Sequence, residues 1–174
     1  MTKINVAVIG FGHLGKWHTQ KANQLENSNL IAIVEPFEAN QKAAKELYPD
    51  VKIVNSINEV INEIDAAVIV TPTSTHFELV KTLLENDKHI FCEKPLCSSF
   101  TEVEALKPLL TDRVLQVGHS ERCHQAWELL SDKFAAITGP KTIKINRFAE
   151  FKGRATDVDV VSDLMIHDID LMLY

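Results

Sequence analysis

The sequence is poor in cysteine and has no long apolar stretch, and each scarcity excludes a class of protein. Its three cysteines are odd in number and form no Cys-x-x-Cys pair, which argues against structural disulfides and zinc knuckles and favours a reducing cytoplasm. No apolar run approaches the ~20 residues that span a bilayer, and the first residues lack a signal-peptide cleavage region. We therefore predict a cytoplasmic protein with no membrane partner.

Positive charge is also scarce, which argues against a nucleic-acid partner. Only four arginines occur, the basic residues are scattered, and the formal net charge is -6, whereas a phosphate backbone is bound by clustered Lys and Arg. The sequence is instead rich in apolar residues, since 45% of its 174 residues are hydrophobic and 24% are charged. Such a chain can bury a core and is not disordered.

Short apolar stretches alternate with stretches of helical periodicity in the first two thirds of the chain. The apolar stretches predict strands over residues 4–9, 30–34, 51–54, 66–70, 89–92 and 114–117. The periodic stretches predict helices over residues 14–25, 39–47, 58–64, 77–85 and 101–110. Repeated strand–helix units predict an α/β fold with a doubly wound parallel (Rossmann) sheet and helices on both faces.

This alternation changes near residues 119–122. A helix is predicted over residues 125–134, followed by alternating polar and apolar residues over 142–148 and a last, largely buried helix over 160–174. We predict a dinucleotide-binding Rossmann domain over residues 1–120 and the beginning of an α+β substrate domain over 121–174. Because about 55 residues are too few for an independent core and the sequence ends inside a predicted helix, we expect a C-terminally truncated protein.

The glycine loop, Gly10-Phe-Gly-His-Leu-Gly15, has the G-x-G-x-x-G pattern between a predicted strand and a predicted helix. The first glycine permits a tight turn, the second lets the backbone approach a pyrophosphate, and the third permits close packing of helix on strand. The helix N-terminus offers free N–H groups to an anion. A purely structural turn is the alternative. The predicted cofactor contacts in this loop are Gly10, Phe11, Gly12, His13, Leu14 and Gly15.

Glu35 ends the second predicted strand, 20 residues after Gly15. A carboxylate at this position can accept hydrogen bonds from the adenosine ribose and would repel a 2′-phosphate. We therefore predict NAD as the cofactor in preference to NADP.

The threonine loop, Thr71-Pro-Thr-Ser-Thr-His76, leaves a predicted strand at the same edge of the sheet as the glycine loop. Its hydroxyls and backbone are placed to line a cofactor groove, unless Ser74 or Thr75 only caps the next helix. The predicted cofactor contacts in this loop are Thr71, Pro72, Thr73 and His76.

Lys94 lies between Glu93 and Pro95, just after a predicted strand, where βαβ proteins place their active sites. Oxidation of an alcohol removes the hydroxyl proton as the hydride leaves for the nicotinamide. An ordinary lysine, with a pKa of about 10.4, is a poor base, but partial burial and a positively charged nicotinamide both lower that value. Glu93 opposes this effect unless a ribose hydroxyl engages it. We predict Lys94 as catalytic and both Glu93 and Lys94 as cofactor contacts; a lysine that caps the next loop is the alternative.

In the last predicted helix, Asp163, His167 and Asp170 follow i, i+4, i+7 spacing and share one narrow stripe. The rest of the circumference is mostly apolar, so this stripe faces either solvent or a site. A site is favoured because a solvent face more often carries Lys, Glu or Gln, and because His transfers protons near neutral pH. These residues could also bind a metal, but the lysine and the glycine loop make a metal unnecessary, and none is predicted.

Together these motifs resemble the Gfo/Idh/MocA family of NAD(P)-dependent oxidoreductases over the whole chain. The resemblance rests on the glycine loop, the threonine loop, Glu93-Lys94-Pro95 and Asp163-Leu-Met-Ile-His167. It implies that Lys94 and His167 handle the proton beside the nicotinamide and that Asp163 supports them. It also implies a longer chain, whose mostly antiparallel second domain shapes the substrate pocket and often mediates homo-oligomerisation.

Within the family, Gly118-His-Ser-Glu-Arg122 and residues 159–170 are most similar to the branch that oxidises the 3-hydroxyl of UDP-N-acetyl sugars, although Cys123-His124-Gln125 replaces the usual Phe-Asn-Pro. The resemblance implies a small-molecule sugar or sugar-nucleotide substrate, contacted by Arg122 and Asp170. Arg122, Arg147 and Arg154 could meet a diphosphate or lie on the surface.

The predicted function is therefore that of an NAD(P)-dependent dehydrogenase acting on a CH–OH group. Two alternatives are a non-catalytic dinucleotide sensor and an inactive truncated fragment. Retention of both Lys94 and His167 favours the enzyme, because a sensor needs neither side chain.

Overall fold

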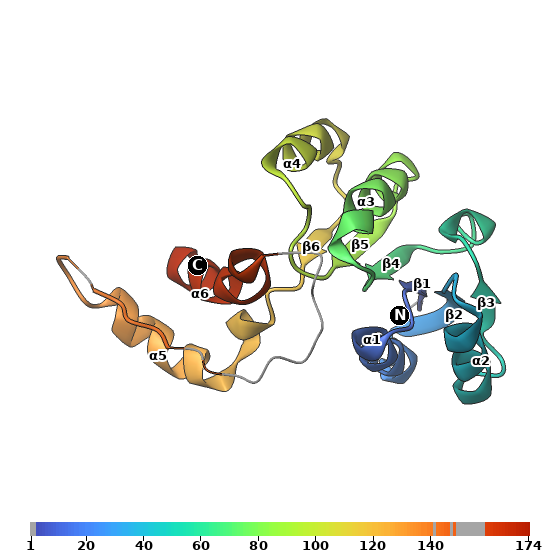
Figure 1. The fold of residues 1–174 in the computed structure, drawn as a ribbon, viewed down its shortest axis with the longest axis horizontal. Helices are drawn as coiled ribbons and strands as arrows, with labels where there is room; N and C mark the ends of the chain where they lie inside the picture. Colours follow the sequence, from blue (N-terminus) through green and yellow to red (C-terminus); the bar gives the residue numbers. More distant parts are fainter. Residues whose placement is uncertain (1–2, 141, 147, 149–158) are drawn as a thin grey trace. The chain divides into compact units, whose positions relative to one another are not determined.

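The computed structural model describes residues 3–140, 142–146, 148 and 159–174 (Figure 1). The chain divides into two compact units, Met1–Gly118 and His119–Tyr174. The first unit contains the sheet, and the described part of the second is helical.

The first unit is built on a six-stranded parallel sheet in the order β3-β2-β1-β4-β5-β6. Its strands are β1 (Ile4–Ile9), β2 (Ser28–Val34), β3 (Lys52–Val54), β4 (Ala66–Ile69), β5 (His89–Cys92) and β6 (Leu115–Val117). The strand order reverses between β1 and β4, so the connections that follow these two strands run to opposite faces of the sheet.

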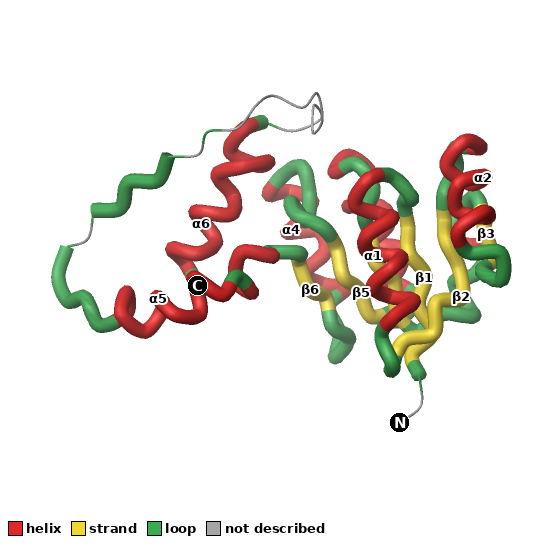
Figure 2. The backbone as a smooth tube through the Cα atoms, turned by 90° about the horizontal axis from the view of Figure 1, so that it is seen from below, coloured by secondary structure: helices red, strands yellow, loops and turns green. Residues whose placement is uncertain are grey.

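Helices cover both faces of this sheet (Figures 1 and 2). They are α1 (His13–Gln24), α2 (Glu38–Leu47), α3 (His76–Glu85) and α4 (Phe100–Leu106). One buried cluster contains Ala22 of α1 and Ala44 of α2, and a second contains Leu83 of α3 and Leu106 of α4. Successive residues of β1 enter these two clusters in alternation, as expected of a strand buried on both faces. The predicted doubly wound parallel fold is confirmed.

Two of the predicted helices are shorter than expected. The helix predicted over residues 58–64 is a single 3₁₀ turn, η1 (Ile57–Glu59), capped at its start by a capping box between Ser56 and Glu59. The helix predicted over residues 101–110 stops at Leu106 and continues as a 3₁₀ turn, η3 (Lys107–Leu109). Pro108 explains this stop, because proline lacks the N–H that an α-helix needs and its ring clashes with the preceding turn.

The described residues of the second unit form no strand. Its elements are a 3₁₀ turn η4 (Ser120–Cys123), α5 (Gln125–Ala135), a π-helical turn η5 (Val161–Met165) and α6 (Ile166–Leu173). Residues 142–146 and 148, where sequence alternation indicated an extended segment, have no regular secondary structure. Across both units, no helix formed by described residues combines the length and the apolarity needed to cross a membrane.

The prediction that the last helix is largely buried is wrong for most of its apolar side chains. Six of them are 43–83% exposed: Val160, Val161, Leu164, Met165, Met172 and Leu173. The buried positions of α6 are instead taken by Asp168 and Asp170, and α6 packs against η4. Hydrophobic periodicity identifies an apolar face but not the surface that covers it, so the sequence pattern could not show which face α6 turns toward η4.

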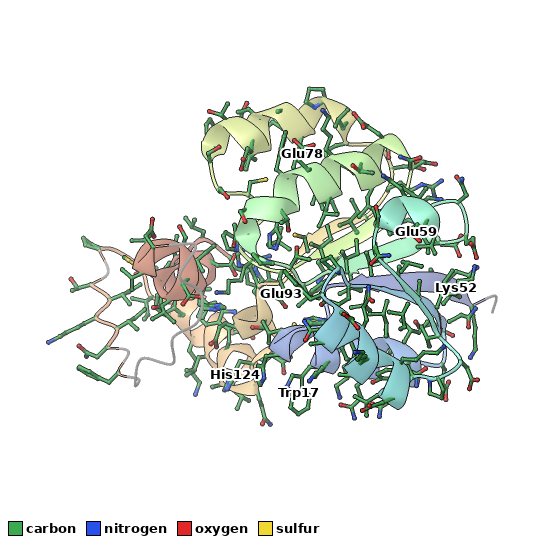
Figure 3. The ribbon with its side chains drawn as sticks, turned by 45° about the vertical axis from the view of Figure 1, so that its right-hand side comes forward. Trp17, Lys52, Glu59, Glu78, Glu93 and His124 are labelled. Atoms are coloured by element: carbon green, nitrogen blue, oxygen red, sulfur yellow. The ribbon has the colours of Figure 1, made fainter. Side chains whose placement is uncertain are left out.

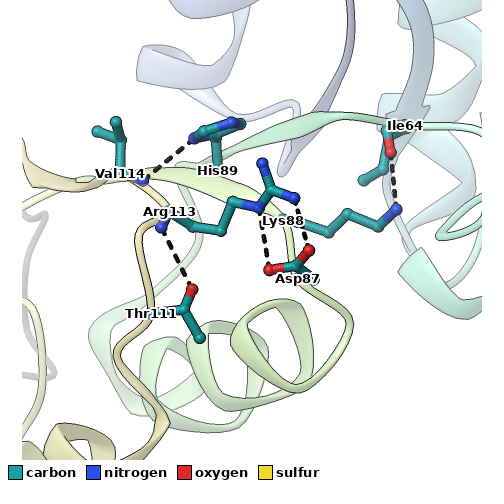
Figure 4. Close-up of polar contacts among 7 residues, drawn as sticks. All are labelled: Ile64, Asp87, Lys88, His89, Thr111, Arg113 and Val114. Atoms are coloured by element: carbon teal, nitrogen blue, oxygen red, sulfur yellow. Dashed lines mark hydrogen bonds and ion pairs between the residues drawn. The ribbon is translucent and has the colours of Figure 1, made fainter.

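A polar cluster lies at the turn between α3 and β5, at the amino-terminal edge of the sheet (Figure 4). Asp87 in this turn has a positive φ of 59°, and its carboxylate accepts two hydrogen bonds from the Arg113 guanidinium (2.9 and 2.6 Å). Lys88 Nζ donates to the carbonyl oxygen of Ile64 (2.9 Å). These contacts tie the start of β5 to the segments that precede β4 and β6.

The start of α4 provides a test of local stability. The Ser99 hydroxyl accepts from the Glu102 N–H (3.3 Å), and the Glu102 carboxylate accepts from the Ser99 N–H (3.2 Å), which completes a capping box. Ser99→Ala should lower the free energy of unfolding by about 1 kcal/mol in a urea titration, because helix N–H groups lose their cap. Thr101→Ala, an exposed change in the first turn of the same helix, is the control and should leave stability unchanged or slightly raised. Equal losses in the two variants would contradict the capping role.

Candidate active site

The carboxyl ends of the central strands meet in register at one edge of the sheet. Ile9 of β1 pairs with Ile69 of β4, which pairs with Cys92 of β5. Beyond these pairs, the Val70 N–H donates to Ile9 (2.9 Å) and the Glu93 N–H donates to Ile69 (3.0 Å). The glycine loop, the threonine loop and the lysine loop (residues 93–96) therefore leave the sheet next to one another.

The three glycines of the glycine loop differ in the space that a side chain would have at each position. Gly10 has φ +97°, and a Cβ there would lie 2.8 Å from the carbonyl oxygen of Val70, while a Cβ on Gly15 would overlap the carbonyl of Gly10. A Cβ on Gly12 would meet no described atom within 4 Å. The fold therefore requires Gly10 and Gly15, whereas Gly12 keeps one side of the loop open, as the approach of a pyrophosphate requires.

Helix α1 begins at this loop with its N-terminus open to an anion. No side chain in the described part of the chain caps α1, and none of the residues in its first turn is acidic. The first N–H groups of a helix have no partner within the helix and carry positive potential. The open side of Gly12 and these N–H groups together fit the pyrophosphate of a dinucleotide.

Glu35 is 3% exposed, and its carboxylate accepts hydrogen bonds from the backbone of two separate segments. Its Oε2 accepts from the Phe11 N–H of the glycine loop (2.8 Å), and its Oε1 accepts from the Phe37 N–H (2.9 Å). The Asn40 side-chain amide adds a bond to Oε2 (3.2 Å). Sequence reasoning missed this role of Glu35 in fixing the glycine loop. Contact of the same carboxylate with a ribose stays a prediction.

The threonine loop is closed by its own polar groups. The hydroxyls of Thr71 and Thr75 lie 2.6 Å apart, the Thr75 hydroxyl donates to the Pro72 carbonyl (2.8 Å), and Thr73 is buried. Among described residues, no side chain caps α3, so the capping alternative for Thr75 does not hold. The loop presents backbone at the edge of the sheet, and its cofactor contacts stay predictions.

His76 links the threonine loop to the lysine loop. Its ring is 1% exposed, with Nε2 2.9 Å from the Thr71 carbonyl oxygen and Nδ1 2.8 Å from the Pro95 carbonyl oxygen. Both ring nitrogens therefore face protein carbonyls. The predicted contact of His76 with a cofactor would thus act through the position of the loops that it joins.

Lys94 begins the segment after Glu93 and is half-buried, and the peptide bond between Lys94 and Pro95 is cis. Glu93 Oε1 lies 2.8 Å from His18 Nε2, and Glu93 Oε2 accepts from the Lys94 N–H (3.3 Å). Burial would raise the pKa of the Glu93 carboxyl, but the hydrogen bonds and charges of His18 and Lys94 together outweigh it and hold that pKa below its usual value. Sequence reasoning missed His18; the available signal was its position on the helix that starts at the glycine loop.

The two cysteines that flank the lysine loop are unsuited to nucleophilic chemistry. Burial raises the pKa of Cys92 to about 12 and that of Cys97 to about 11, so both are thiols at neutral pH. The described residues also contain no cluster of three or more His, Cys, Asp or Glu side chains that could hold a metal ion. The proton-handling role of Lys94 stays a prediction.

The second unit holds the other predicted catalytic residues, Asp163 and His167, and both are half-buried. Asp163 lies in the π-helical turn η5 and His167 in α6. A π-helical turn contains one more residue per hydrogen-bonded ring than an α-helical turn, so the stripe assumed from α-helical spacing is altered at Asp163. The catalytic roles of Asp163 and His167 stay predictions.

Arg122 and Asp170, both predicted to contact substrate, bind one another. Arg122 Nε donates to Asp170 Oδ2 (2.7 Å), and Arg122 Nη2 donates to Asp170 Oδ1. The hydrogen bond of Arg122 holds the pKa of Asp170 below its usual value, although burial opposes this. The Arg122 guanidinium also lies over the Tyr174 ring, 4.5 Å from its centroid. Arg147 and Arg154 lie outside the described residues.

Comparison with known proteins matches the part of the chain that contains the glycine, threonine and lysine loops. Residues 4–119 match the family model described as "Oxidoreductase family, NAD-binding Rossmann fold". The chain belongs to the Gfo/Idh/MocA oxidoreductase family. Its predicted family is confirmed, and so is NAD as the cofactor of that family.

Individual members of the Gfo/Idh/MocA family match almost the whole chain. It is 37% identical over 177 residues to the UDP-N-acetylglucosamine 3-dehydrogenase of Acidithiobacillus ferrooxidans, covering 99% of this chain and 54% of the relative. It is 30% identical over 185 residues to the scyllo-inositol 2-dehydrogenase (NAD(+)) of Bacillus subtilis, covering 99% and 54%. A solved structure of the Acidithiobacillus enzyme superposes with a TM-score of 0.85 and covers 99% of this chain and 56% of its own. The chain thus spans about half the length of these relatives.

The unequal roles of the glycines in the glycine loop can be tested by two matched substitutions. Gly10→Ala should lower the free energy of unfolding by about 1–3 kcal/mol, because alanine is strained at positive φ and its Cβ meets Val70. Gly12→Ala should unfold as wild type does but bind NAD at least tenfold more weakly, a loss of ~1.4 kcal/mol, because its Cβ fills the open side of the loop. Urea unfolding and calorimetric NAD titration measure the two effects. Unaltered NAD affinity in Gly12→Ala would contradict the proposed approach of the pyrophosphate.

The Arg122–Asp170 pair predicts an acid-dependent stability. A lowered carboxyl pKa stabilises the fold above the usual value of about 3.8, and this stability is lost as pH falls through the lowered pKa. Arg122→Leu should therefore cost about 1–2 kcal/mol at neutral pH, since a buried carboxylate loses its guanidinium and keeps His119 at 3.5 Å, and should flatten the loss of stability below pH ~4. Unfolding is followed by Trp127 fluorescence in a Trp17→Phe background. In an Asp170→Asn background, Arg122→Leu should lower the free energy of unfolding by less than it does in the wild type. An equal loss in the two backgrounds would show that the ion pair does not contribute to stability.

Proposed function

We propose that the protein is an NAD-dependent dehydrogenase that oxidises a CH–OH group of a sugar or sugar nucleotide. The observation that carries this proposal is the placement of Lys94 at the strand edge where the glycine loop begins α1. A hydride-transfer site needs a loop that binds the cofactor's pyrophosphate and, close to it, a group that handles the proton. Here the glycine loop follows β1, and Lys94 follows β5, two strands away. The named activities of the 37% and 30% identical relatives support the same chemistry.

The residues of this chain would divide the work as follows. The glycine loop and the first N–H groups of α1 bind the pyrophosphate, and the carboxylate of Glu35 disfavours a 2′-phosphate, which selects NAD over NADP. When bound, NAD accepts the hydride at C4 of its nicotinamide. Lys94, together with His167, takes the proton from the substrate hydroxyl, and Asp163 supports them.

The substrate class follows from the relatives. We propose a UDP-N-acetyl sugar, oxidised at its 3-hydroxyl, because the more similar relative carries that name, with Arg122 and Asp170 in contact with the substrate. An inositol is the second candidate, because another relative at 30% identity is named as an inositol dehydrogenase. The proposal includes a cytoplasmic homo-oligomer, the assembly that the family resemblance implies.

The role of Lys94 is tested on the protein with NAD and either UDP-N-acetylglucosamine or scyllo-inositol. Lys94→Ala should reduce turnover by at least about 100-fold, the usual contribution of a general base, and should leave NAD affinity within a few-fold of wild type. Turnover is measured from the NADH absorbance band and affinity by calorimetry. Lys42→Ala on α2, where the side chain is 71% exposed, is the control and should keep full activity.

Three outcomes of that experiment separate the hypotheses. Near-normal turnover in Lys94→Ala would remove Lys94 from the mechanism. Binding of NAD without reduction by either class of substrate would favour a non-catalytic dinucleotide sensor. Failure of the wild-type protein to bind NAD would overturn the proposal as a whole.

A further inference from the structure

A histidine of α1 binds the carboxylate that precedes Lys94. His18 and Glu93 are 75 positions apart, yet their side chains meet at 2.8 Å and are only 25% and 18% exposed. The His18 ring also packs on the ring of Phe91, with centroids 5.3 Å apart. Phe91 and Glu93 project from the same side of the chain because they are two residues apart in an extended segment. One apolar and one polar contact therefore fix the orientation of the His18 ring.

The second oxygen of the Glu93 carboxylate is fixed as well. Glu93 Oε2 accepts from the Lys94 N–H (3.3 Å). A Cβ on Gly118, directly after β6, would lie 3.1 Å from the same oxygen, so a glycine here gives the carboxylate its space. Glu93 is thus enclosed by α1, by its own loop and by the end of β6. Figure 3 shows Glu93 within the body of the first unit, whereas Trp17, the neighbour of His18, projects outward and is 57% exposed.

The consequence for Lys94 is electrostatic. A carboxylate beside a lysine stabilises the ammonium form and resists loss of its proton. A hydrogen-bond donor on the far side of that carboxylate offsets part of its negative potential. His18 is such a donor, and it shares the charge of Glu93 with Lys94.

We propose that His18 is a positioning residue for Lys94: it fixes the Glu93 carboxylate and draws its negative charge toward α1, so that Lys94 releases its proton more readily. This inference rests on the proposed proton-handling role of Lys94. Because α1 begins at the glycine loop, the contact between His18 and Glu93 also links that loop to Lys94 through one helix. Neither the family match nor the relatives' names assign this role.

The test measures the reactivity of the Lys94 amine directly in the 174-residue chain. Trace acetylation with acetic anhydride over a range of pH, followed by mass spectrometry, gives the rate at Lys94 relative to exposed Lys42, which serves as the internal reference. His18→Leu should lower the relative rate at Lys94 by about three- to tenfold, the equivalent of half to one pH unit. His18→Gln, which places an amide N–H near the position of Nε2, should restore most of it.

A purely structural tie predicts the opposite sign, because a loosened lysine loop exposes the amine and speeds its acetylation. An unchanged or raised Lys94 rate in His18→Leu would therefore overturn the proposal. Glu93→Gln provides a second arm if His18→Leu fails to fold. It should raise the Lys94 rate, and in the double variant it should abolish the effect of His18→Leu; a fall in the Glu93→Gln rate would overturn the proposal independently. Acetylation needs neither NAD nor substrate, so failure of the proposed dehydrogenase activity would be recognised separately, by absent NAD binding or turnover.

Discussion

The parallel pairing of β1 with β4 is the constraint on which the candidate site depends. Because Ile9 and Ile69 are partners, the glycine loop and the threonine loop start at the same height of the sheet. The strand order reverses at this pair, so the two connections run to opposite faces of the sheet, and open α/β sheets bind ligands at the carboxyl ends of such strands. The pairing of β4 with β5 then adds Lys94 one strand further along. A shift in either register would separate Lys94 from the glycine loop.

Two buried or half-buried carboxylates hold this arrangement together. Glu35, after β2, binds the glycine loop through the Phe11 N–H, and Glu93, after β5, binds α1 through His18. The glycine loop and its helix are therefore held by two acids, one after β2, which pairs with β1, and one after β5, which lies beyond β4. Each acid also accepts a backbone N–H of its own segment, which offsets the free energy lost when a charged group leaves water. Two acidic side chains thus lie near the glycine loop as part of the fold.

In the first unit, the sequence predicted the strands and helices better than the contacts between distant side chains. Apolar runs and the glycine pattern located the strands and α1, because both depend on residues close in the chain. The contact between His18 and Glu93 depends on strand order and register across 75 positions, which periodicity does not encode. The helix predicted over residues 58–64 is only the 3₁₀ turn η1, because a capping box such as that of Ser56 and Glu59 starts a helical turn but does not set how far the helix continues. The prediction that the last helix is buried was wrong because an apolar face in the sequence does not show which surface covers it.

The Arg122–Asp170 pair shows why charge alone does not define a substrate site. Both residues were assigned to substrate from resemblance, and an arginine that binds a phosphate has the same sequence letter as one that binds a carboxylate. In the structure the guanidinium is already engaged by both oxygens of a buried aspartate and lies on an aromatic ring. A diphosphate would therefore either compete with Asp170 or bind the N–H groups of Arg122 that Asp170 leaves open. The second course leaves the ion pair intact, because a guanidinium has five N–H donors and the paired aspartate uses only part of them. Asp170 would then orient Arg122 for the substrate while its own charge stays with the guanidinium.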